Sequence, residues 1–315
     1  MFDVQQWLFE SVFQPVMLWL DMGSYVEDGY VAADWFIWGC LQVALIAFVL
    51  VPLQRLRPAE PVRDHATIRV DMLYTFIHRL GLFRLGMFLT LKPFLDEVFG
   101  ALRSGSFVSF DIGTFHLDQL WPSLTDNFII SFLIYLVALD FFGYWIHRAQ
   151  HGLRAWWALH SLHHAQQQMT CWSDNRNHLL DDIIVDVLFI CAAFLIGVSP
   201  SQFVLIVVLT QLSESLQHAN LRLSFGRVGE RLWVSPRFHR LHHSIGVGHE
   251  TVLAHQTVLG GSNFGVLLPV WDILGGTANF KYRFDPTGVR DQVEQGRDYG
   301  AGFWAQQRLG MLRLM

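Results

Sequence analysis

The 315-residue chain is 52% hydrophobic and 16% charged, with a mean hydropathy of +0.31. This is more apolar surface than one soluble domain can bury, so the composition favours an integral membrane protein. A formal net charge of −5 without a polybasic run excludes a surface that binds nucleic-acid backbones. The three isolated cysteines indicate reduced thiols. The N-terminus lacks the positive leader and cleavage site of a signal peptide, so we expect it to be retained.

The first predicted membrane span runs from about Asp34 to Leu53. Acidic residues precede it, and the loop after it carries Arg55, Arg57, Arg63 and Arg69. The positive-inside rule therefore places its C-terminal end in the cytoplasm. Residues 71–97 are also apolar but contain four basic or histidine side chains, which favours a broken or partly interfacial helix pair.

Residues 128–146 predict another span, since Asp140 is their one charged residue, and His147 follows directly. In 181–217, two apolar runs are joined by a Gly-Val-Ser-Pro sequence, which stops one helix and starts the next. We expect a helical hairpin whose arms, at about 1.5 Å per residue, cross most or all of a ~30 Å hydrocarbon core. The hairpin would bring His178 and His218 to the same membrane face.

Together these segments predict an all-α fold: a multi-pass transmembrane helix bundle with a cytoplasmic helical cap that holds a histidine-rich di-metal site. No internal repeat or low-complexity linker divides the chain. We expect N-terminal transmembrane and interfacial helices at 1–127, a catalytic domain at 128–280 and a C-terminal helical tail at 281–315.

Histidines dominate the middle of the chain, where three short motifs read HRAQH, HSLHH and HRLHH. On a helix, spacings of three and four return side chains to one face, so each motif can aim two or three imidazoles at one point. Neutral imidazole suits first-row transition metals. The candidate metal-ligating and catalytic residues are His147, His151, His160, His163, His164, His178, His218, His239, His242 and His243.

Ten imidazoles exceed what one metal ion can use, which indicates two ions. A structural zinc ion needs four ligands and a hydrolytic zinc ion usually three. Iron, with larger coordination numbers and redox chemistry, fits better. Beside a bilayer the obvious substrates are lipid C–H bonds, whose oxidation requires activated oxygen.

Other polar residues are assigned less demanding roles. His65, His78 and His116 are expected to be interfacial side chains, whereas the roles of His249 and His255 stay open. Glu214, four residues before His218, is either a direct ligand or a carboxylate that orients a ligand. The other candidates for orienting the imidazoles are Asp140, Asp174, Asp181, Asp182, Asp186 and Asp272.

From about 130 to 280 the chain resembles the fatty acid hydroxylase superfamily of membrane di-iron proteins, in its bacterial sterol-desaturase-like branch. The resemblance is carried by the three histidine motifs, NRNH around His178, QHANLR around His218, Asn263-Phe264-Gly265 and WDILGGT at 271–277. It implies that the ten histidines bind two iron ions, which activate O2. It also implies electrons from a separate cytochrome b5-like, ferredoxin or flavin donor. The implied location is the bacterial inner membrane, with the endoplasmic reticulum second, and the site faces the cytoplasm.

Three positions depart from the family pattern. Glu214 stands where many members have a further histidine, and the segment 244–262 is longer than usual. Gly275 replaces an aromatic residue common in the Trp-Asp motif.

The leading hypothesis is an O2-dependent enzyme that hydroxylates or desaturates a lipid, without a choice between the two reactions. A zinc-dependent membrane hydrolase is one alternative, although the chain has no H-E-x-x-H motif. A non-enzymatic membrane protein that binds haem or carries metal is another, but haem needs paired axial histidines rather than triplets.

Overall fold

The computed structural model describes residues 2–90, 117, 121–253 and 256–315. This part of the chain is mostly helical, as the sequence predicts, and its single sheet has two short strands. The chain divides into one unit of residues 1–48 and 75–110 and another of 49–74 and 111–315.

Within the first unit, short helices lead into one long helix. The short elements are α1 (Phe2–Leu8), a π-helical turn (Phe9–Phe13), α2 (Gln14–Trp19) and a 3-10 turn (Gly23–Tyr25). The long helix is α3 (Val26–Leu45). The buried Arg79 side chain donates a hydrogen bond to Gln42 Oε1 at 3.1 Å. The backbone of Arg79 also lies close to Gly39, since a Cβ on Gly39 would be 1.7 Å from the Arg79 carbonyl oxygen. A turn at residues 80–81 separates α5 (His65–Arg79) from helical residues 82–90. The predicted helix break is confirmed there, whereas 91–97 lie outside the described residues.

Two helices among the described residues are long and apolar enough to cross a membrane: Gly23–Leu56 and Phe128–Gly152. The first contains the predicted span and is continuous through a π-helical stretch (Ile46–Leu50) into α4 (Val51–Leu56). The second is α9, which continues beyond the predicted end at residue 146. Because no glycine or proline occurs between residue 146 and Gly152, His147 and His151 stay on α9 rather than starting a separate element.

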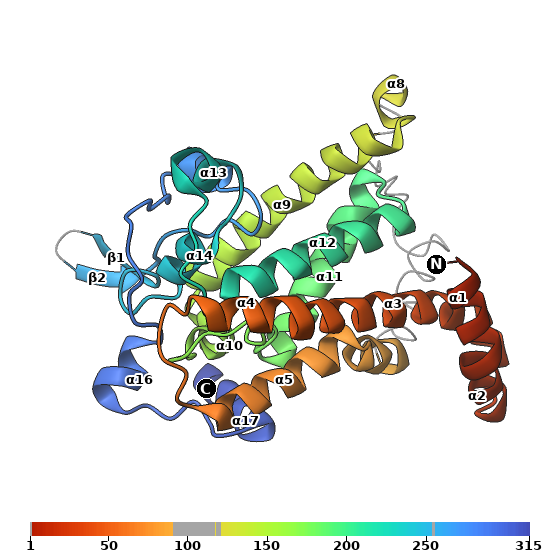
Figure 1. Ribbon diagram of the computed structural model, residues 1–315, viewed down its shortest axis with the longest axis horizontal. Coiled ribbons are helices and arrows are strands. Elements are labelled where there is room, and N and C mark those ends of the chain that lie inside the picture. Colours follow the sequence, from red (N-terminus) through yellow and green to blue (C-terminus); the bar gives the residue numbers. More distant parts are fainter. Residues whose placement is uncertain (1, 91–116, 118–120, 254–255) are drawn as a thin grey trace, which may run out of the picture. The chain divides into compact units, whose positions relative to one another are not determined.

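The predicted helical hairpin is confirmed as α11 (Leu179–Ile196) and α12 (Pro200–His218), but neither arm is one of the two helices with the length and composition of a membrane span. Gly197 ends α11 with φ 80°, a left-handed conformation that glycine adopts without strain. In Figure 1, α9 lies beside both arms, and it packs against each of them. Their shared core is made by Tyr135, Leu136, Leu139, Ala192, Ala193, Ile206 and Leu267.

Short elements gather at one end of these three helices. Helix α10 (Arg154–His164) packs against α9, α11 and α17 (Phe303–Leu314), and α14 (Pro236–His242) packs against α12. The antiparallel pair β1 (Glu250–Leu253) and β2 (Gln256–Leu259) was not predicted, because four residues are too few to show an alternating pattern. Among the described residues, the remaining helices are α8 (Pro122–Thr125), α13 (Gly226–Leu232), α15 (Val270–Gly275) and α16 (Arg290–Gln295).

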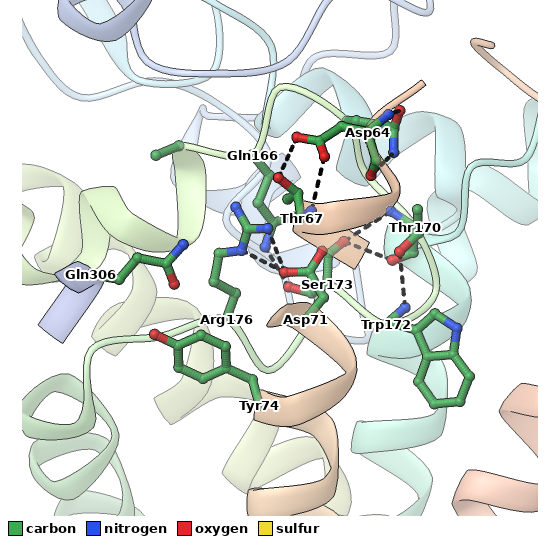
Figure 2. Close-up of polar contacts among 12 residues, drawn as sticks. Asp64, Thr67, Asp71, Tyr74, Gln166, Thr170, Trp172, Ser173, Arg176 and Gln306 are labelled. Carbon is green, nitrogen blue, oxygen red and sulfur yellow. Dashed lines mark hydrogen bonds and ion pairs between the residues drawn. The ribbon is translucent and has the colours of Figure 1, made fainter. Parts of the chain in front are cut away.

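A buried ion pair joins the first half of α5 to the segment between α10 and α11 (Figure 2). Arg176 Nε and Nη2 each lie 2.5 Å from Asp71 Oδ1, and the two side chains are 4% and 0% exposed. One turn further along α5, the Tyr74 hydroxyl accepts a hydrogen bond from Gln307 of α17 at 2.9 Å. These contacts hold Asp71 and Tyr74 of α5 against the chain that carries the histidines.

Removing one partner of this pair should destabilise the protein strongly. Arg176→Met leaves the Asp71 carboxylate buried without its cation, and we expect a loss of about 3–5 kcal/mol of unfolding free energy. The double variant Arg176→Met/Asp71→Leu should recover most of that loss. Arg297→Ala is the control, because it breaks a largely exposed pair with Asp291 and should cost less than ~1 kcal/mol. Denaturant unfolding in detergent measures all three, and an Arg176→Met variant as stable as the parent would contradict the expectation.

Candidate metal centre

Eight of the ten predicted histidines form two groups of four buried side chains. Within each group, one ring nitrogen per residue lies within 4.8 Å of the others. We call them the first group, His147, His151, His164 and His242, and the second group, His163, His218, His239 and His243. Neither group includes a carboxylate among the described residues.

The two groups adjoin because each His-His doublet contributes to both. In α10, His164 belongs to the first group and His163 to the second, and His242 and His243 divide in the same way at the end of α14. Consecutive helical side chains differ by about 100° in direction, so a doublet can face two neighbouring points. The rings of His164 and His243 stack with centroids 4.2 Å apart. The doublets therefore hold the two sites next to each other.

The ring nitrogens of each group converge. His218 Nε2 lies 3.1 Å from Nε2 of both His163 and His239, and His151 Nε2 lies 3.1 Å from His164 Nε2. Burial holds the pKa of His163, His239 and His242 well below 6.5, which leaves these imidazoles neutral. The buried His242 Nε2 has no hydrogen-bond partner among the described residues. Neutral, converging imidazoles of this kind fit a transition-metal cation.

Backbone carbonyls fix the orientation of three of these rings. His147 Nδ1 lies 2.9 Å from the Phe264 oxygen, His242 Nδ1 lies 2.8 Å from that of Ser262, and His218 Nδ1 lies 2.8 Å from that of Glu214. A carbonyl can only accept, so each Nδ1 carries the hydrogen and each Nε2 keeps its lone pair. Glu214 thus contacts His218 through its backbone, and its carboxylate belongs to neither group.

The Asn-Phe-Gly and Trp-Asp motifs support those carbonyls. Asp272 accepts hydrogen bonds from the amides of Phe264 and Gly265, at 2.8 and 2.7 Å, and from Thr277 Oγ1 at 2.6 Å. Asn263, with φ 64°, donates to the carbonyl oxygen of Phe238 in α14 at 3.0 Å. Asp272 therefore acts on the site through the backbone, one step further from the imidazoles than the sequence suggested.

Two other candidate aspartates are buried and hydrogen-bonded, but only Asp181 contacts an imidazole. Asp140 accepts hydrogen bonds from the Leu267 and Leu268 amides and from Trp271 Nε1, at 2.8–3.1 Å, and so ties α9 to the segment that ends in the Trp-Asp motif. Asp181 accepts from Gln150 Nε2, Trp156 Nε1 and His160 Nδ1, at 2.8, 2.7 and 3.0 Å.

His160 lies beside the first group without belonging to it. Its Nδ1 faces Asp181, and its Nε2 lies 3.3 Å from His164 Nε2. The Asp181 carboxylate leaves His160 Nε2 free to face the site.

The structure does not bring His178 to either group. Its Nδ1 accepts from the Leu180 amide at 3.1 Å, capping α11, and its Nε2 donates to the Gln307 carbonyl at 2.9 Å. Both ring nitrogens are therefore used in joining α11 to α17.

His249 reaches the site although its role was left open. Its Nε2 lies 2.9 Å from His164 Nδ1. Of the other single histidines, His65 is exposed and His78 is half-buried. His116 and His255 lie outside the described residues.

Gly275, a departure from the family pattern, has a steric explanation. A Cβ at this position would lie 2.0 Å from the Tyr144 hydroxyl, which is 3.1 Å from Thr277 Oγ1. A larger side chain would displace Tyr144 from the Trp-Asp motif.

Comparison with known proteins assigns this region. Residues 132–277 match the fatty acid hydroxylase family model. Over 182 residues the chain is 29% identical to the ornithine lipid hydroxylase OlsE of Rhizobium tropici. The aligned region is 56% of this chain and 51% of that protein. The chain thus spans about half the length of this curated relative. No solved structure matches the chain. The predicted superfamily and its bacterial branch are confirmed.

The metal-free protein should lose stability as pH falls. Burial lowers the pKa of His163, His164 and His243 well below 6.5 in the fold, whereas in the unfolded chain they titrate near 6.5. Their contribution is complete above pH 6.5 and is lost as pH drops below it, because only the unfolded state then takes up protons, at about 1.4 kcal/mol per group and pH unit. Unfolding followed in chelator between pH 8 and 5 measures this, and a pH-independent midpoint would contradict it.

Proposed function

We propose that this protein is a membrane di-iron oxygenase that hydroxylates a lipid, using O2 and electrons from a separate donor. The observation that carries the proposal is the pair of adjoining four-imidazole groups. Membership of a hydroxylase family and the similarity to a lipid hydroxylase support the reaction class. Both comparisons favour hydroxylation over desaturation.

The residues that would hold the metal ions are the eight members of the two groups, one ion in each. His160 Nε2 is a further ligand candidate for the first group because Asp181 fixes its other nitrogen. We no longer propose His178 as a ligand, since both of its ring nitrogens have backbone partners. Iron, when bound, supplies the redox chemistry that activates O2 for attack on aliphatic C–H bonds. The protein itself orients the imidazoles and buries the site.

A zinc hydrolase accounts less well for the same geometry. Four imidazoles close the coordination of a tetrahedral zinc ion, whereas a hydrolytic zinc ion keeps a position open for water. Neither group offers a carboxylate base among the described residues.

The proposed setting is a multi-pass bundle in the bacterial inner membrane, with the two histidine groups and the 281–315 tail on the cytoplasmic side. Two helices have the length and composition of membrane spans. One of them is α9, which carries His147 and His151 near its C-terminal end. We propose a polar membrane lipid as substrate, and the name of the relative suggests ornithine lipid as the first to test. The three cysteines are free, which fits a chain without its own iron–sulfur cluster and electrons from a cytochrome b5-like, ferredoxin or flavin partner.

Metal analysis and turnover of the purified protein test the proposal. We expect about two iron ions per chain and lipid hydroxylation that requires both O2 and reductant. His163→Ala and His242→Ala should each lower activity by at least ~100-fold, because loss of a ligand exceeds the 10–100-fold effect of losing a residue that only orients one. His65→Ala, at an exposed histidine, should leave iron content and activity unchanged. One zinc ion per chain with O2-independent turnover would reject the proposal.

Lipid analysis of cells with and without the protein separates the two oxidations. A gain of one oxygen in a lipid supports hydroxylation, whereas loss of two hydrogens shows desaturation instead.

A further inference from the structure

His249 comes from the long segment 244–262 and is buried beside the first group, with 3% of its surface exposed. Its ring meets that of His164 edge to face at 4.5 Å between centroids, and Trp157 lies within 5.4 Å of both rings. The nitrogen that His249 presents, Nε2, faces Nδ1 of His164 at 2.9 Å. His164 Nε2 points the other way, 3.1 Å from His151 Nε2.

We propose that His249 is a positioning residue for the metal centre: its Nε2 accepts the hydrogen of His164 Nδ1 and so holds His164 Nε2 toward the first group. This inference rests on the proposed metal centre. When Nε2 of a neutral imidazole binds a metal ion, Nδ1 carries the hydrogen and needs an acceptor. His147, His218 and His242 use backbone carbonyls for this purpose, whereas His164 uses a side chain that can be substituted.

The backbone around His249 is built to hold it there. A Cβ on Gly248 would lie 1.7 Å from the His242 carbonyl oxygen, and one on Gly261 would lie 1.9 Å from that of Gly248. The His249 carbonyl accepts from the Gly260 amide at 2.9 Å, across the start of the β1–β2 pair. These close approaches are possible because the residues are glycines. His249 is thus clamped directly against α14, the helix that supplies His242.

The side of the segment that faces away from the site is anchored separately. Arg290 of α16 donates from Nε and Nη2 to the two carboxylate oxygens of Glu250, at 2.8 and 2.9 Å. This ion pair is exposed and does not involve the His249 ring. It therefore supplies a control that loosens the segment without removing the imidazole contact.

Cobalt(II) binding to the metal-free, detergent-purified protein tests the proposal without turnover. We expect two cobalt ions per parent chain. In His249→Leu, one of the two should bind about 10- to 100-fold more weakly, with altered visible absorption bands, because His164 has lost its acceptor. His249→Gln places an amide oxygen near the position of Nε2 and should restore both the affinity and the bands, whereas the shorter His249→Asn should not.

Two controls separate the ring contact from general packing. Glu250→Gln weakens the ion pair with Arg290, and His65→Leu alters a distant exposed histidine; both should bind cobalt as the parent does. Equal weakening in Glu250→Gln and His249→Leu would overturn the inference, as would unchanged binding in His249→Leu or failure of His249→Gln to differ from His249→Asn. If the parent chain itself binds no pair of metal ions, the proposed function fails first, and that result is distinguishable from failure of His249 alone.

Discussion

The structure depends on the convergence of neutral imidazoles in two adjoining buried groups. His218 donates from Nδ1 to the Glu214 carbonyl, so its Nε2 offers one lone pair, which cannot accept hydrogen bonds from both His163 Nε2 and His239 Nε2, each 3.1 Å away. The cation proposed at each centre would supply the missing partner. Metal binding would then be coupled to the packing of α9, α10, α12 and α14, as expected when ligands come from separate helices.

The His-His doublets determine where α10 and α14 lie relative to the two histidine groups. Since His163 and His164 face different groups, as do His242 and His243, α10 and α14 must each lie between the two sites. α9 then completes the first group with His147 and His151, and His218 at the end of α12 joins the second. The hairpin matters for function because its second arm brings His218 back to the level of α10 and α14.

Local rules predicted the parts of this site that depend on helix periodicity. The i, i+3 and i, i+4 spacings placed the motif histidines on common faces, and Gly197 marked the hairpin turn. They failed for His178, because nearness to a motif does not say which way a helix-capping ring turns. His249 lies in no periodic pattern. The available signal was the glycine on its N-terminal side, Gly248, in a segment longer than the family pattern, since glycines there indicate close backbone approach.

The two groups differ in how their outer nitrogens are supported. In the first, His147, His164 and His242 have acceptors for Nδ1, whereas in the second only His218 has one among the described residues, and the Nδ1 atoms of His163, His239 and His243 have none there. An imidazole whose Nδ1 is already hydrogen-bonded loses less conformational freedom when its Nε2 binds a metal ion. The first group is thus the more preorganised of the two, and its support comes from the segment between α14 and the Trp-Asp motif.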